Sequence, residues 1–79
     1  MISELLNNIK EAHLKLQELQ QDTECINDKL IYRYQCEIIN SYCEYLYITR
    51  SKNAYWNHYR WGHQHPEEEI KIITQNLNL

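Results

Sequence analysis

The chain has 79 residues, which excludes more than one domain and leaves room for only a small core. Its apolar fraction of 43% argues against wholesale disorder, and no apolar run approaches the roughly 20 residues that span a bilayer. The net charge of −3 is unevenly divided: acids dominate both ends, whereas residues 32–65 are mildly basic and hold every aromatic residue. The first residues show no basic region followed by an apolar run, so we expect a cytoplasmic protein with reduced cysteines.

The predicted elements are all helices, because residues 1–61 contain neither Gly nor Pro. A β-protein of this size needs several tight turns, which those two residue types usually mark. The first helix is predicted over about residues 3–21, where apolar residues recur at alternating steps of four and three. The positions of this heptad pattern are Leu5, Ile9, Ala12, Leu16 and Leu19.

A second helix is predicted over about residues 24–49. On one continuous helix its apolar stripe would lie roughly opposite the first, so we expect a chain reversal in residues 20–24, with Asp22 or Thr23 as the N-cap. The heptad pattern of the first helix continues through Thr23, Ile26 and Leu30 before it fails, which argues against a chain reversal in residues 20–24. The second stripe is wider than one helical neighbour requires. Its members are Ile31, Tyr32, Cys36, Ile38, Ile39, Tyr42, Cys43, Leu46 and Tyr47. We therefore expect two neighbours, from the same chain or from a second copy, and we expect a homodimer.

A short aromatic helix is predicted over residues 54–61, with Ser51 or Asn53 as its N-cap. Gly62 fits the position just after a helix, where a left-handed backbone favours glycine. Residues 63–65 are predicted to form a loop.

The last helix is predicted over residues 66–77. Pro66 suits the first helical position, and three glutamates follow it at the positive end of the helix dipole. The predicted fold is all-α: a small helical bundle built on an antiparallel helical hairpin with two short C-terminal helices.

The three cysteines are Cys25, Cys36 and Cys43. Their odd number argues against a disulfide framework. On one helix, seven residues separate two side chains by about 10 Å, too far for Cys36 and Cys43 to share a disulfide or a zinc ion. We interpret them as small core residues, which free cysteines commonly are.

Three histidines, His58, His63 and His65, are the candidates for a metal site. Their spacing matches no standard zinc pattern, and two of them, His63 and His65, lie in the predicted loop next to Gly62 and Pro66. We therefore expect no metal and no other cofactor, and interpret the histidines as ordinary polar residues at a helix junction.

The chain contains no Gly-rich phosphate loop and no nucleophile elbow. A cysteine nucleophile with a histidine base is not excluded by residue types, but Cys36 and Cys43 fall on the predicted packing face. The sequence therefore favours a protein that is not an enzyme.

The aromatic, mildly basic centre predicts a surface for binding another macromolecule. Tyr, Trp and Arg dominate the energetics of protein interfaces. An inhibitor, an adaptor or a small subunit fits this reading, and a phage-encoded inhibitor of a host machine fits the small size. The candidate partner-binding residues are Tyr34, Tyr45, Arg50, Lys52, Tyr55, Trp56, Tyr59, Arg60 and Trp61.

Two alternatives apply to the same residues. Segment 50–61 interleaves bases with aromatic rings, as single-stranded nucleic-acid-binding proteins do, although a pI of about 5.7 argues against it. The rings could instead close the core, or bury against a second copy of the chain.

Overall fold

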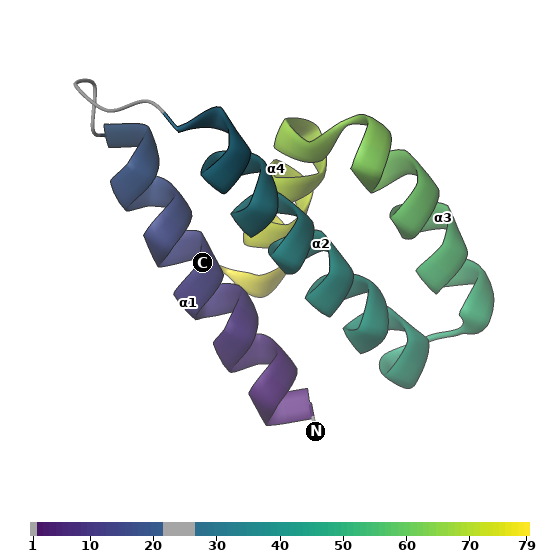
Figure 1. Cartoon of the computed structure of the whole chain (residues 1–79). Coiled ribbons are helices and arrows are strands. Elements are labelled where there is room, and N and C mark those ends of the chain that lie inside the picture. Colours follow the sequence, from purple (N-terminus) through teal and green to yellow (C-terminus); the bar gives the residue numbers. More distant parts are fainter. Residues whose placement is uncertain (1, 22–26) are drawn as a thin grey trace.

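The computed structural model describes residues 2–21 and 27–79, which form four helices. These are α1 (Ile2–Gln21), α2 (Asp28–Thr49), α3 (Lys52–Gln64) and α4 (Pro66–Leu77). Figure 1 shows α1 and α2 side by side and antiparallel, with α3 on the other side of α2. The α4 helix crosses one face of α2, and the chain ends beside α1 (Figure 1). The predicted all-α bundle with a helical hairpin and two short helices is confirmed.

The heptad stripe of α1 faces the core, as predicted. Ile9, Ala12 and Leu16 are buried, and the outer members Leu5 and Leu19 are half-buried. Neither α1 nor any other helix within the two described ranges combines the length and apolar character needed to cross a bilayer. The buried residues form one cluster: Ile9, Ala12, Leu16, Ile38, Ile39, Tyr42, Cys43, Leu46, Ile70 and Ile73.

The start of α2 differs from the prediction. The side chain of Asn27 caps α2 by accepting a hydrogen bond from the backbone N–H of Leu30 at 3.1 Å, so the helix begins at Asp28 rather than at residue 24. Gln20 and Gln21 still belong to α1. The proposed N-caps Asp22 and Thr23 lie outside the described residues.

The α2 helix is the centre of the molecule, because it packs against each of the other three helices. The wide apolar stripe of α2 therefore finds its neighbours within the same chain and needs no second copy. At the edges of that stripe Tyr32 and Tyr47 are exposed rather than buried. The homodimer stays a prediction, but it no longer draws support from the width of the stripe.

The turn between α2 and α3 is short and is fixed by Ser51. Its hydroxyl accepts a hydrogen bond from the backbone N–H of Ala54 at 3.2 Å, which confirms one of the two predicted N-caps. With Ser51 as the cap, α3 begins at Lys52, two residues before the predicted start.

Gly62 was predicted to follow the end of α3. It instead lies inside α3, and its φ is not positive. A Cβ at this position would lie 3.0 Å from the Cγ of Glu69 and 3.0 Å from the Cγ2 of Ile39, so glycine allows α2, α3 and α4 to approach closely. Consequently the predicted loop at residues 63–65 shrinks to His65, which separates α3 from α4.

The α4 helix begins at Pro66 and ends at Leu77, as predicted. Proline suits the start of a helix because its missing N–H would have no helical partner there. The amide of Asn76 donates a hydrogen bond to the hydroxyl of buried Tyr42 at 3.0 Å, which ties α4 to α2.

Candidate functional site

Four aromatic side chains from α2 and α3 meet beside the turn that joins these helices. The ring of Tyr55 stacks on that of Tyr59, with centroids 5.7 Å apart and planes 13° apart. Trp56 and Tyr47 each present a ring edge-on to Tyr55, at 5.1 and 6.0 Å. Trp56 also lies 5.9 Å from Tyr59. We call Tyr47, Tyr55, Trp56 and Tyr59 the aromatic cluster.

The aromatic cluster is largely open to solvent. Tyr47 is 56% exposed, Trp56 47% and Tyr59 36%, whereas Tyr55 is half-buried and packs against the core. Burial, with the neighbouring Tyr59, raises the pKa of Tyr55 above its ordinary value. Tyr55 therefore keeps its hydroxyl proton at neutral pH and anchors the exposed rings.

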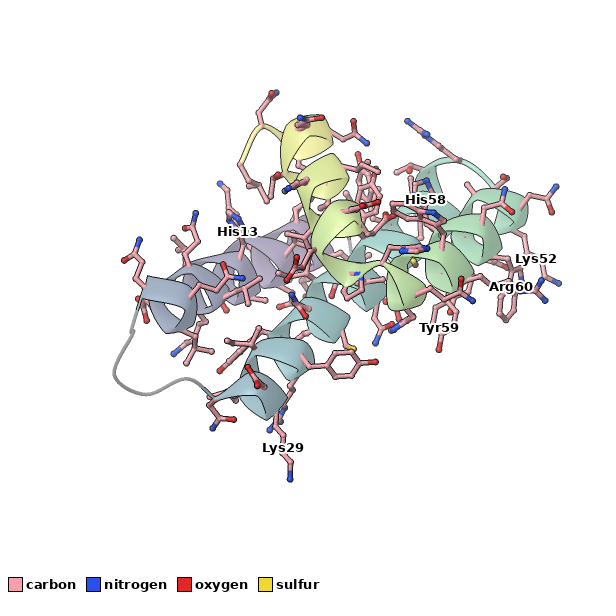
Figure 2. All side chains as sticks on the ribbon, turned by 90° about the horizontal axis from the view of Figure 1, so that it is seen from above. His13, Lys29, Lys52, His58, Tyr59 and Arg60 are labelled. Atoms are coloured by element: carbon pink, nitrogen blue, oxygen red, sulfur yellow. The ribbon has the colours of Figure 1, made fainter. Side chains whose placement is uncertain are left out.

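Basic side chains border the aromatic cluster, and the whole of α3 carries no acidic residue. Arg50 caps the C-terminus of α2, Lys52 begins α3, and both are exposed. Figure 2 shows Lys52, Tyr59 and Arg60 on the side of α3 that faces away from α4. This side of α3 thus carries basic and no acidic residues, although Glu44 of α2 lies near enough to help raise the pKa of Tyr55.

Three of the predicted site residues lie elsewhere. Trp61, which is 37% exposed, lies on the α4 side of α3, with its ring 5.1 Å from that of His65. Tyr45 packs against the core and stacks on Tyr42, with ring centroids 6.0 Å apart. Tyr34 is half-buried at the seam between α1 and α2. The structure therefore keeps six of the nine candidates on or beside one surface.

Tyr47 belongs to the aromatic cluster, although it was predicted to lie on the buried stripe of α2. A signal for its position was present in the sequence. Tyr47 and Tyr55 each lie four residues from Ser51, and side chains at equal distances from a tight turn meet when two helices run antiparallel.

The histidines have separate partners and do not converge. His58 contacts Glu69, His63 contacts Cys36 and Asn40, and His65 contacts Trp61. Within residues 2–21 and 27–79, no group of three His, Cys, Asp or Glu side chains is arranged to hold a metal ion.

Glu69 is the polar residue that sequence reasoning missed. It was interpreted only as one of three glutamates at the start of the last helix, but its side chain is 0% exposed and its Oε1 lies 2.8 Å from the Nδ1 of His58. Its Oε2 has no hydrogen-bond partner among the described residues. The signal was its spacing, four residues before buried Ile73 and therefore on the inner face of α4.

A pocket of about 380 Å³ opens beside this pair. It is lined by Asn57, His58, Trp61, Glu69 and Ile72. On the inner side of the pair lies Cys43, whose pKa is raised to about 12 by burial and by the Glu69 carboxylate. Cys43 is therefore a protonated, inert thiol at neutral pH, as expected for a core cysteine.

Cys36 differs from Cys43, because it is only half-buried. Its Sγ lies 3.8 Å from the Nδ1 of His63, and the Nε2 of His63 lies 3.0 Å from the Oδ1 of Asn40. Cys36 and Asn40 are one turn apart on α2, whereas His63 comes from the last turn of α3. The prediction that the cysteines are core residues is thus right for Cys43 and wrong for Cys36, which is half-buried between α2 and α3, whereas Cys25 lies outside the described residues.

Comparison of the chain with protein-family models, with curated proteins and with solved structures finds no match. Its function must therefore be argued from its own side chains.

Proposed function

We propose that this chain is a non-enzymatic binding protein that docks on another protein through the aromatic cluster. The observation that carries the proposal is the meeting of Tyr47, Trp56 and Tyr59 at one exposed surface. Exposed rings gathered in one patch are typical of interaction sites, because their burial removes a large apolar area from water. Tyr and Trp are also enriched in the residues that dominate interface energies.

The charges around the aromatic cluster favour a partner of opposite sign. Lys52 and Arg60 lie on the same side of α3 as Tyr59, and α3 has no acid to neutralise them. We therefore propose a partner surface with an apolar patch bordered by carboxylates. Such complementarity raises the rate of association and excludes partners with a basic rim.

The binding test compares two tryptophans on opposite sides of α3. Trp56→Ala and Tyr59→Ala should each weaken the partner complex by about 30-fold or more, as expected for interface hot spots. Trp61→Ala is the matched control, because Trp61 is similarly exposed but lies on the α4 side. The partner is first captured from the native host with the wild-type chain, and its affinity for each purified variant is then measured.

Circular dichroism of each variant shows whether the helices persist. Equal binding by folded Trp56→Ala, folded Tyr59→Ala and wild type would contradict the proposal, as would an equal loss with Trp61→Ala. If Trp56→Ala and Tyr59→Ala both unfold, the two rings are needed for the stability of the fold, and the proposal of a docking surface is wrong.

Two other occupants of the surface give different results. Single-stranded nucleic acid would bind the free chain, with an affinity that falls steeply as salt rises. Tight binding of a poly(dT) oligonucleotide with that salt dependence, and no captured protein, would replace the proposal. Light scattering that shows a dimer in the wild type and a monomer in Trp56→Ala would assign the surface to a second copy.

A further inference from the structure

Side chains of a cysteine, a histidine and an asparagine contact one another in sequence between α2 and α3. Cys36 Sγ, the imidazole of His63 and Asn40 Oδ1 follow one another at 3.8 and 3.0 Å. A nucleophile beside a base that a third group orients is the general arrangement of an activated thiol. The docking role proposed above does not use these three residues.

The position of the imidazole proton follows from the chemistry of these three side chains. The Oδ1 of Asn40 only accepts hydrogen bonds, so the Nε2 of His63 carries the proton and donates it. The Nδ1 of His63 then presents its lone pair to Cys36, and the thiol donates to it. His63 is thus held in the tautomer that accepts a proton from Cys36.

Two neighbouring rings support this arrangement. The ring of Tyr59 lies 4.6 Å from that of His63, which restricts the orientation of the imidazole. One turn before Cys36, a hydrogen bond with the Cys36 sulfur raises the pKa of the Tyr32 phenol. The side chain of Tyr32 therefore lies close enough to Cys36 to interact with its sulfur.

We propose that Cys36 is a thiol–disulfide exchange site for small disulfides, with His63 as its base and Asn40 as the positioning residue for His63. The thiol proton passes to the Nδ1 of His63, and the thiolate attacks one sulfur of the disulfide. A new S–S bond forms at Cys36 as the old S–S bond breaks. The departing thiolate takes the proton from His63, so Cys36 is oxidised and the other half of the disulfide is reduced.

The place of Cys36 in α2 explains why a disulfide fits better than an acyl donor. Acyl transfer needs free N–H donors for an oxyanion. Cys36 lies well inside α2, beyond the first turn, so the backbone N–H groups around it are already used by the helix. Exchange at sulfur needs only an accessible thiol with a base beside it, and the half-buried Cys36 next to the Nδ1 of His63 meets both needs.

The test measures how fast glutathione disulfide modifies each cysteine at neutral pH. All variants carry Cys25→Ser, so that only Cys36 and Cys43 react, and mass spectrometry of peptides locates the adduct. Cys36 should react at least tenfold faster than Cys43, because Cys43 is fully buried and protonated.

The variants separate a chemical from a steric role of His63. His63→Ala uncovers Cys36, so a side chain that only shields the thiol would speed the reaction when removed, whereas loss of a base should slow it about tenfold or more. Asn40→Ala should also slow the reaction, and Asn40→Asp, which keeps an acceptor at this position, should retain it. His65→Ala is the control and should leave the rate unchanged.

Asn40 is exposed, so Asn40→Ala provides the test even where His63→Ala unfolds. Modification of Cys36 no faster than Cys43 overturns the proposal. The proposal is also overturned if His63→Ala raises the rate of Cys36 modification, or if Asn40→Ala leaves that rate equal to the wild-type rate.

Discussion

At Gly62 the helices α2, α3 and α4 approach one another closely. The atoms that a new Cβ would meet belong to Glu69 and Ile39, and both side chains are fully buried in the packed core, so a shift of either disturbs its neighbours. Gly62→Ala should therefore destabilise the protein. An extra methyl in a packed core costs about 1–3 kcal/mol, whereas alanine gains about 1 kcal/mol over glycine inside a helix, so we expect a net loss of up to about 2 kcal/mol.

Urea denaturation of Gly62→Ala measures this loss. Asn57→Ala is the control, because Asn57 is exposed on the same helix and its replacement should leave the stability almost unchanged. A Gly62→Ala protein as stable as the wild type would show that the three helices have room for a side chain at this position.

Cys43 makes the fold sensitive to alkaline pH. Burial and the Glu69 carboxylate raise its pKa from 9.0 to about 12. The unfolded chain loses this proton from about pH 9, whereas the folded protein holds it up to about pH 12. The stability due to this thiol is therefore complete below pH 9 and is lost as the pH rises to 12, at roughly 1.4 kcal/mol per pH unit.

The measurement is the free energy of unfolding at neutral pH and midway between the two pKa values. Cys43→Ala should be less stable at neutral pH, because it leaves a cavity, but should lose less on going to alkaline pH. Ile73→Val is the comparison, because it leaves a cavity without removing a titratable group, and it should lose as much as the wild type. Parallel losses in all three proteins would mean that Cys43 titrates normally in the folded state.

At the scale of elements, Ser51 sets the geometry of the candidate site. Its hydroxyl caps α3, and the turn it forms places Tyr47 opposite Tyr55. Ser51→Ala should lower the free energy of unfolding by about 1 kcal/mol, because the N–H of Ala54 loses its acceptor. Ser51→Asp, which keeps a capping oxygen, should restore most of that stability.

Thermal unfolding followed by circular dichroism checks this prediction. Asn53→Ala is the matched control: Asn53 was the other predicted N-cap, but it lies within α3 and no cap bond depends on it. An equal loss in Asn53→Ala and Ser51→Ala would contradict the assignment of the cap.

The helices themselves were largely predictable, because their signals are local. The Pro66 start of α4 and the Ser51 cap of α3 follow from the chemistry of one or two residues. The predicted end of α3 was wrong because a glycine at position 62 has two possible roles. A left-handed turn and a close approach of helices both favour glycine, and only the neighbouring helices decide between them.

At the scale of the whole molecule, α2 lies between two chemically different neighbours. The side of α2 toward α1 buries aliphatic residues of the heptad, and the side toward α3 carries the contacts among Cys36, His63 and Asn40. The aromatic cluster lies at the other end of the α2–α3 pair, next to the turn. One helical pair thus carries both the proposed docking surface and the proposed exchange site, and Tyr59 contacts His63 between them.

The sequence by itself determined that this chain is a bundle of helices with its aromatic residues in the middle, because periodicity, caps and breakers act over a few residues. Only the tertiary structure decided which rings meet. The separation of Trp61 from Trp56, the burial of Glu69 and the meeting of Cys36 with His63 depend on how α2, α3 and α4 are rotated and how closely they pack. Those angles and distances follow from contacts between residues far apart in the chain, such as Gly62 with Ile39, which no local pattern encodes.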